Sequence, residues 1–231
     1  MQQPTDEPGI DWLWKTGIVA IVRGIPADAA LDVAGALYEG GIRVIEVALN
    51  TDGAPDMLRR ILDIYKEKLW VGAGTVLDVP LAEIALNSGA QFFVTPNFNE
   101  RVIDYAVHHR IPVFSGALTA TEVVNTFQAG ATIVKIFPSR SVGPGYIKEL
   151  RGPLPHIPLM AVGGISATNA AEFIQAGVQT VGVGGSLVDK RAIQEKDFAQ
   201  IHQNAVELVR VVHGALTHMN KSTTGNASSD G

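Results

Sequence analysis

Short apolar runs alternate along the chain with longer segments in which apolar residues recur every three or four positions. The short runs are rich in β-branched residues and do not alternate with polar ones, which is typical of strands buried on both faces of a parallel sheet. The longer segments have the periodicity of amphipathic helices. Eight runs are predicted to be strands: residues 17–24, 43–50, 70–76, 92–96, 112–118, 133–138, 158–165 and 180–183.

One strand and one helix make a unit that returns eight times along the chain. The units are spaced by roughly 20 to 27 residues, which fits a strand, a helix and two short loops. Eight such units predict a single α/β domain, a (β/α)8 TIM barrel over residues 17–217. An open doubly wound sheet is the alternative. It does not require such even spacing, and no Gly-x-Gly-x-x-Gly motif follows the first strand.

The two ends of the chain differ from the barrel in pattern. Residues 1–16 are predicted to form an N-terminal helical segment whose Trp12 and Trp14 cover one end of the core. The last helix is expected over about residues 199–216, and residues 218–231 are rich in Ser, Thr, Asn and Gly. Because such a segment cannot bury enough apolar surface to order itself, a disordered tail is predicted.

Composition favours small-molecule chemistry in one domain. A chain of 231 residues with 46% hydrophobic residues suits one large core rather than two domains. The net charge of −5 and the scattered basic residues give no general attraction to nucleic acid or to membrane lipid. The absence of cysteine excludes disulfides and thiolate chemistry. Because the start lacks a signal-peptide pattern and no apolar run approaches about 20 residues, a cytoplasmic protein is expected.

Three ionisable residues lie inside apolar strands: Arg23, Glu46 and Lys135. Burial lowers the pKa of a lysine, and a neutral lysine amine attacks carbonyl carbons. Lys135 is predicted to be a Schiff-base lysine, because a closed barrel has no edge strand on which it could simply be exposed. Glu46 is predicted to transfer protons beside it, and a structural salt bridge between the two is the alternative.

Glycines at the ends of the last two predicted strands indicate a phosphate site. The seventh strand ends in Val162-Gly163-Gly164-Ile165-Ser166, and the eighth ends in Gly184-Gly185-Ser186. Free main-chain N–H groups, helix N-termini and a hydroxyl are therefore expected at one place. Either glycine group alone could consist of turn residues only.

Other polar residues give weaker signals. Thr75 and the pair Thr95-Pro96 end two further strands, where they could bind a carboxylate or serve as caps. His108 and His109 have no carboxylate or third histidine at ligand spacing, so no metal is predicted.

Taken in order, the strand-end motifs resemble those of the 2-dehydro-3-deoxy-phosphogluconate (KDPG) and 4-hydroxy-2-oxoglutarate (KHG) aldolases and their phosphogalactonate-cleaving relatives. The resemblance covers residues 18–188. Its motifs are Ile-Val-Arg-Gly, Val-Ile-Glu-Val, Val-Gly-Ala-Gly-Thr-Val, Val-Thr-Pro-Asn, Val-Lys-Ile-Phe-Pro-Ser, Gly-Gly-Ile-Ser and Gly-Gly-Ser. It implies a class I aldolase that forms homotrimers and uses neither a metal nor another cofactor.

The resemblance also implies roles for individual residues. Lys135 is implied to be the Schiff-base lysine, and Glu46 the general acid and base. Arg23 is implied to neutralise the far end of the substrate. The remaining expected substrate contacts are Thr75 and Pro96 in a pyruvyl pocket, Phe137 as a wall behind the lysine, and Gly163, Gly164 and Ser186 at the phosphate, with Gly184 and Gly185 beside them.

Two positions depart from the gluconate-type pattern. Asn50 stands where those members commonly carry arginine, and Val162 stands where they carry threonine. Both departures resemble the phosphogalactonate branch, so weak discrimination between the two sugar-acid phosphates is expected.

The function that these observations favour is cleavage of 2-keto-3-deoxy-6-phosphogluconate, or a related 2-keto-4-hydroxy acid, to pyruvate and an aldehyde such as glyceraldehyde 3-phosphate. Decarboxylation of oxaloacetate is an expected side activity. The alternatives are a phosphosugar isomerase or epimerase on the same barrel, and a phosphosugar-binding module without catalysis.

Overall fold

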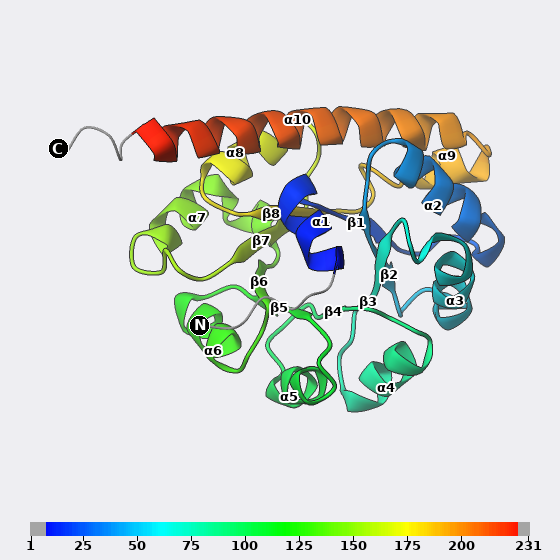
Figure 1. Ribbon diagram of the computed structural model, residues 1–231, viewed down its shortest axis with the longest axis horizontal. Helices are drawn as coiled ribbons and strands as arrows, with labels where there is room; N and C mark the ends of the chain where they lie inside the picture. Colours follow the sequence, from blue (N-terminus) through cyan, green and yellow to red (C-terminus); the bar gives the residue numbers. More distant parts are fainter. Residues whose placement is uncertain (1–7, 226–231) are drawn as a thin grey trace.

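The computed structural model describes residues 8–225, which form one barrel of parallel strands surrounded by helices (Figure 1). The strands pair in chain order, and the last pairs with the first to close the barrel. The predicted (β/α)8 fold is confirmed. The strands are β1 (Ile18–Val22), β2 (Val44–Ala48), β3 (Trp70–Gly74), β4 (Phe93–Val94), β5 (Val113–Ala117), β6 (Ile133–Ile136), β7 (Leu159–Val162) and β8 (Thr180–Val183).

Helices follow the strands and cover the outside of the barrel (Figure 1). They are η1 (Ala27–Ala29), α2 (Ala30–Glu39), α3 (Ala54–Tyr65), α4 (Val79–Asn87), α5 (Glu100–His108), α6 (Ala120–Gln128), η2 (Ser139–Ser141), α7 (Gly143–Arg151), α8 (Ala170–Gln175), α9 (Lys190–Gln194) and α10 (Phe198–Gly225). Several begin at polar caps: the side chains of Asp78 and Asn99 accept first-turn N–H groups of α4 and α5. Local sequence chemistry thus sets where these helices start.

The helix α1 (Pro8–Thr16) closes the amino-terminal end of the barrel. Its buried Ile10 and Leu13, three residues apart, lie on one face and pack against the barrel interior. Trp12 packs only partly there, whereas Trp14 is 39% exposed. The prediction that both tryptophans cover the core was therefore wrong for Trp14, because helical geometry turns it away from the face that holds Leu13.

Aromatic side chains fill the interior just above α1. The rings of Trp70 and Phe92 have centroids 4.5 Å apart, and those of Phe92 and Phe114 are 4.9 Å apart. Strand residues that face outward pack instead against the helices in a separate, larger core. The amino-terminal half of the barrel is therefore solid, and space for a ligand is left at the carboxyl ends of the strands.

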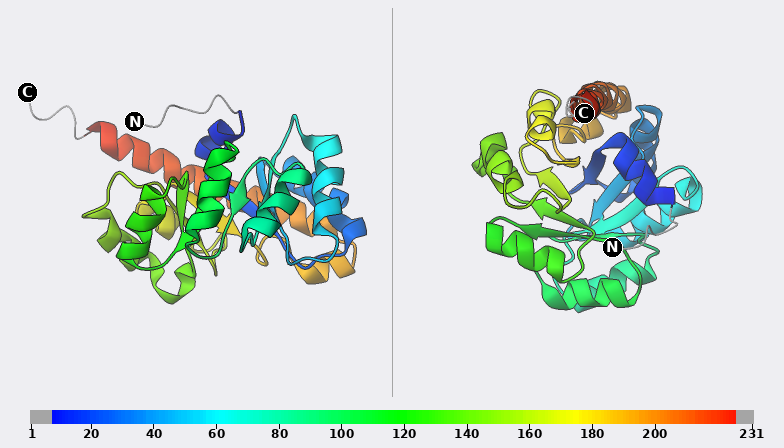
Figure 2. Two further views of the ribbon diagram at one scale, coloured as in Figure 1. Left: turned by 90° about the horizontal axis from the view of Figure 1, so that it is seen from below. Right: turned by 60° about the vertical axis from the view of Figure 1, so that its left-hand side comes forward.

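The last helix runs along one side of the barrel, and its end projects beyond the neighbouring helices (Figure 2). It packs against α2 and α8. The helix continues through Gly225 rather than ending near Leu216, so residues 218–225 are helical and not part of a disordered tail. Extending an existing helix fixes one residue for each new hydrogen bond, and Met219 still packs against the outer core. Residues 226–231 lie outside the described residues. None of the helices in the described part is long and apolar enough to cross a membrane.

Candidate active site

Lys135 and Glu46 both face the interior of the barrel. Lys135 pairs in register with Met160 of β7, and Glu46 pairs with Ile21 of β1. Met160 and Ile21 belong to the interior cluster, and residues side by side on neighbouring strands share a face. Lys135 is 3% exposed and Glu46 is fully buried. The strand lysine is therefore buried, as the sequence predicted.

Glycine makes the room for the buried carboxylate and for the loop beside the lysine. A Cβ atom on Gly74 would overlap the side chain of Glu46. A Cβ atom on Gly116, the β5 partner of Lys135, would overlap the main chain of Pro96. The close approaches at these two positions thus require glycine.

Burial shifts the pKa values of both groups toward their neutral forms. Burial raises the pKa of Glu46, against the opposing effects of the positive charges of Lys135 and Arg23. Burial lowers the pKa of Lys135, which Glu46 partly restores and Arg23 lowers further. The amine nitrogen lies 5.1 Å from the ring centre of Phe137. More of the lysine is therefore a free amine at a given pH than in solution.

The carboxylate of Glu46 has no hydrogen-bond partner among the described residues. A structural salt bridge would hold its oxygens with direct hydrogen bonds from Lys135. Because no such bond is present, the arrangement does not favour the salt-bridge alternative. It leaves a buried proton acceptor next to a buried amine.

The amine of Lys135 faces a cavity of about 540 Å³ at the carboxyl ends of β1, β6, β7 and β8. The cavity brings together residues that the sequence singled out on four separate strands or the loops after them. They are Arg23, Lys135, Phe137, Val162, Gly163, Gly164, Gly184, Gly185 and Ser186.

Three other predicted residues lie close to this cavity without lining it. Glu46 is fully buried and interacts electrostatically with Lys135 and Arg23, which line the cavity. The main chain of Pro96 lies against Gly116, the strand neighbour of Lys135. Thr75 accepts a hydrogen bond of 3.0 Å from Arg23 and has a φ of 59°, an unusual value for a β-branched residue.

Asn50 lies elsewhere. It lines a neighbouring cavity of about 670 Å³ between the loops after β1 and β2 and the helix α9. Lys190 borders both cavities, whereas Asn50 borders the neighbouring cavity and not the one that contains Lys135. The structure therefore does not bring Asn50 together with Lys135.

The glycine loops after β7 and β8 present unused main-chain donors. The N–H groups of Gly164, Gly185 and Ser186 donate to no acceptor in the described part of the chain. Gly164 has a φ of 74°. The helix α8 begins at Ala170, several residues beyond these glycines, so the expected helix N-terminus does not adjoin them. Loop amides, rather than a helix end, form the candidate anion site.

Two basic residues of the cavity wall were missed from the sequence. Arg140 follows β6 and lies against Gly164, while its N–H donates to the carbonyl oxygen of Gly163 over 2.9 Å. Lys190 starts α9 after β8. Their only sequence signal was their place a few residues beyond a strand, where ordinary surface cations also occur. Among the described residues, no three His, Asp or Glu side chains gather as metal ligands.

Comparison with known proteins gives one family. The sequence model of the family described as "KDPG and KHG aldolase" matches residues 10–204 of this chain. The chain belongs to this aldolase family. As a member it is an aldolase, an enzyme that breaks a carbon–carbon bond.

Relatives of this aldolase cover most of its chain. The 2-dehydro-3-deoxy-6-phosphogalactonate aldolase of Escherichia coli (strain K12) is 38% identical over 205 residues, which are 86% of this chain and all of the relative. A chain of a cube-shaped cage, designed by fusing symmetric oligomeric domains, superposes with a TM-score of 0.84 and 34% identity, covering 93% of this chain and 78% of that one. The KDPG aldolase of Legionella pneumophila, with pyruvate captured as a covalent carbinolamine, has a TM-score of 0.80 and 25% identity, covering 85% and 96%.

Proposed function

We propose that this class I aldolase uses Lys135 as its Schiff-base nucleophile to cleave a phosphorylated 2-keto-4-hydroxy acid to pyruvate and an aldehyde. The observation that carries this proposal is the amine of Lys135, which is buried, reaches a cavity and has its pKa lowered by burial. The covalent pyruvate in the Legionella pneumophila relative supports the same chemistry.

The reaction begins when the neutral amine attacks the keto carbon of the substrate. Loss of water from the carbinolamine gives a protonated imine, which withdraws electrons from the bond between the third and fourth carbons. A base takes the proton of the 4-hydroxyl group, that bond breaks, and the aldehyde leaves. The bonding electrons remain on the third carbon as an enamine. Protonation there and hydrolysis of the imine release pyruvate and restore the amine.

Glu46 is the proposed base and, in the reprotonation step, the proposed acid. Its oxygens have no other partner among the described residues, so they can accept a proton directly or through a water molecule. Because burial raises its pKa, the carboxyl group holds a proton to higher pH than a free glutamate does, which suits a group that donates a proton as well as accepts one. Thr75 and Pro96 are proposed to shape the pyruvyl end of the site, with Phe137 behind the lysine.

The phosphate is proposed to bind the N–H groups of Gly164, Gly185 and Ser186, which lie unused on the cavity wall. Arg23 then neutralises the anionic far end of the substrate. The same imine also accepts oxaloacetate, because loss of carbon dioxide leaves electrons on the same enamine carbon. Oxaloacetate decarboxylation is therefore an expected side reaction.

The preferred sugar acid is proposed to follow Val162, which lines the cavity directly before Gly163. A threonine hydroxyl at this position could hydrogen-bond one orientation of a substrate hydroxyl, whereas valine can bond neither. One such bond changes affinity by roughly 0.5 to 1.5 kcal/mol, or about two- to tenfold. The phosphogalactonate aldolase from Escherichia coli supports the assignment to that branch.

The test is kcat/KM for the gluconate phosphate, the galactonate phosphate and 4-hydroxy-2-oxoglutarate. We expect the two phosphates to be cleaved within about one order of magnitude of each other, and Val162→Thr to widen their ratio. Val181→Thr, at a buried position of the outer core, is the matched control and should leave the ratio unchanged. A hundredfold preference for the gluconate phosphate in the unaltered protein would contradict the proposal. A preference for the unphosphorylated acid would show that the glycine loops do not bind phosphate.

The enzyme is further proposed to be a homotrimer. The family resemblance implies three subunits, and the similar chain in the designed cage comes from a symmetric oligomer. Apolar side chains on the outside of the described barrel, such as Ile64, Leu77, Ile84 and Val107, offer area for such contacts.

A further inference from the structure

The cavity above Lys135 has an uneven charge. Besides Lys135 it is lined by three cations, Arg23, Arg140 and Lys190, and none of the described residues that line it is Asp or Glu. A concave wall with charges of one sign raises the local potential and attracts an oppositely charged ligand. The cavity therefore suits a substrate with more than one negative charge.

Two of these cations have no partner within the part of the chain that the structure describes. The guanidinium group of Arg23 donates to Thr75, but the side chains of Arg140 and Lys190 make no hydrogen bond or ion pair with a described residue. Both side chains are exposed at the mouth of the cavity. Their charges are consequently available to a ligand.

The two side chains stand on opposite sides of the glycine loops. Around the barrel, β6, β7, β8 and β1 are neighbours. Arg140 follows β6, and its Cβ atom lies 2.7 Å from the position that a Cβ on Gly164 would take. The amine of Lys190 lies 2.9 Å from the corresponding position on Gly24, directly after β1. The loops that carry Gly164 and Gly185 lie between them.

We propose that Arg140 and Lys190 bind the phosphate of the substrate from two sides and thereby set the preference of this aldolase for phosphorylated over unphosphorylated 2-keto-3-deoxy sugar acids. A phosphate group carries a charge near −2 at neutral pH, whereas the loop amides carry only partial charges. The two cations supply the remaining neutralisation. This inference rests on the proposed aldol cleavage.

The test compares 2-keto-3-deoxy-6-phosphogluconate with the same sugar acid lacking the phosphate. In Arg140→Met combined with Lys190→Met, the ratio of the two kcat/KM values should fall by about tenfold or more, mainly through a higher KM for the phosphate. Arg140→Lys keeps the charge and should retain most of the ratio. A ratio within twofold of the unaltered protein in the double variant would overturn the proposal.

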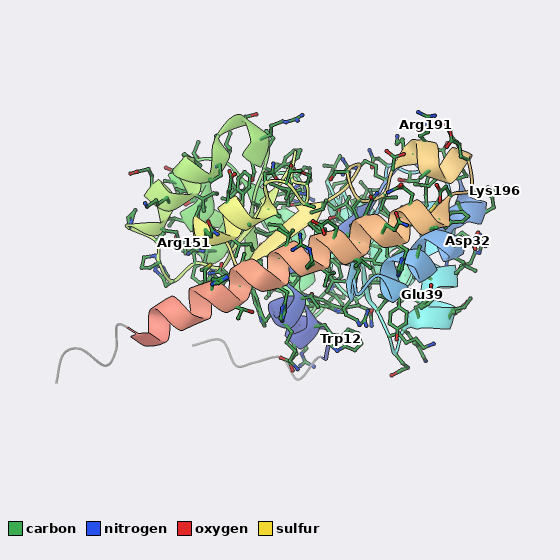
Figure 3. All side chains as sticks on the ribbon, turned by 90° about the horizontal axis from the view of Figure 1, so that it is seen from above. Trp12, Asp32, Glu39, Arg151, Arg191 and Lys196 are labelled. Carbon is green, nitrogen blue, oxygen red and sulfur yellow. The ribbon has the colours of Figure 1, made fainter. Side chains whose placement is uncertain are left out.

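Arg191→Met is the matched control. Arg191 adjoins Lys190 but lies outside the cavity, where it pairs with Glu195 on the surface (Figure 3). Its loss removes one positive charge, as each of the two cavity substitutions does, and should not change the ratio. Inorganic phosphate gives a second measurement, since its inhibition constant should rise in the double variant and not in Arg191→Met. An unchanged inhibition constant would also count against the proposal.

Pyruvate lacks a phosphate, so trapping it on Lys135 with borohydride tests the chemistry separately. If the unaltered protein forms the adduct and cleaves the substrate while the ratio does not respond to the double variant, only the inference on Arg140 and Lys190 fails. If the unaltered protein forms no adduct and cleaves neither substrate, the proposed function itself fails.

Discussion

The titration of Lys135 is set by its surroundings in the barrel. Burial lowers its pKa below the ordinary value of 10.5, and the negative charge of Glu46 partly opposes this. Because only the neutral amine attacks a carbonyl carbon, the rate of imine formation should rise with pH through this lowered pKa. We expect a midpoint below 10.5 when the rate of pyruvate trapping by cyanoborohydride is measured against pH.

The pH dependence of trapping in Glu46→Gln shows whether Glu46 raises or lowers the pKa of Lys135. Removing the carboxylate removes an interaction that favours the ammonium form, so the midpoint should move to lower pH. Trapping does not require cleavage of a carbon–carbon bond, so it remains measurable in this variant. A midpoint at or above 10.5 in the unaltered protein, or an upward shift in Glu46→Gln, would contradict the account.

Thr75 combines backbone strain with a hydrogen bond to Arg23. Thr75→Val keeps the β-branched strain and removes the hydroxyl, whereas Thr75→Gly removes both. Each variant should raise KM by about two- to tenfold, because Arg23 loses the same partner. Thr75→Gly should nevertheless unfold with a free energy about 1 kcal/mol greater than that of Thr75→Val. Urea denaturation measures this difference, and a less stable glycine variant would show that the φ value of Thr75 stores no strain.

At the scale of elements, Arg151 joins the end of α7 to the loops before β7 and β8 (Figure 3). Its guanidinium group donates to the carbonyl oxygens of Gly177 and Ile157 at 2.8 and 2.7 Å, and to the side chain of Gln179 at 2.9 Å. Gln179 in turn accepts the N–H of Leu159. One side chain at the end of α7 thus satisfies main-chain carbonyl groups of both loops.

Arg151→Met should therefore lower the free energy of unfolding by about 1.5–3 kcal/mol, because these carbonyl groups lose a charged donor. Arg210→Met is the control. Among the described residues, Arg210 pairs with Glu207 alone, on an exposed face of α10, so the melting temperature of this variant should stay unchanged. Active protein from Arg151→Met should keep its KM. Equal melting temperatures for the two variants would contradict the assigned role.

The elements themselves could be predicted where local pattern and fold agree. Every predicted strand is present, because each apolar run is buried on both faces and closed by turn residues. The predicted end of α10 was wrong, because composition does not reveal that adding residues to an existing helix costs little free energy. The predicted burial of Trp14 was wrong, because two tryptophans that are two residues apart do not lie on the same face of a helix.

Site residues could be predicted where their chemistry conflicts with their position. A lysine and a glutamate inside apolar strands stand out, and the structure buries both within one barrel. Arg140 lies in the short helix η2 and Lys190 begins α9, and exposed cations are ordinary at such surface positions, so nothing in the sequence distinguished them. Asn50 was assigned by resemblance alone, and the path of its loop takes it into a neighbouring cavity.

At the scale of the whole molecule, three subunits are expected. Analytical ultracentrifugation should give about three times the chain mass of 24.5 kDa at micromolar concentration. Replacing the exposed Ile84 and Val107 by Lys should shift the mass toward one subunit if these side chains contribute to the contact. Sedimentation as a single chain in the unaltered protein would contradict the trimer.

The central claim is that Lys135 forms a covalent bond with the substrate, and mass spectrometry after reduction tests it most directly. The protein is incubated with pyruvate, reduced with borohydride and digested. Reduction fixes the imine nitrogen, so the account predicts one adduct, about 72 Da heavier than the free chain, on the peptide that contains Lys135. Lys135→Arg should form none. An unmodified Lys135 in protein that cleaves its substrate, or an adduct on a different lysine, would contradict the account.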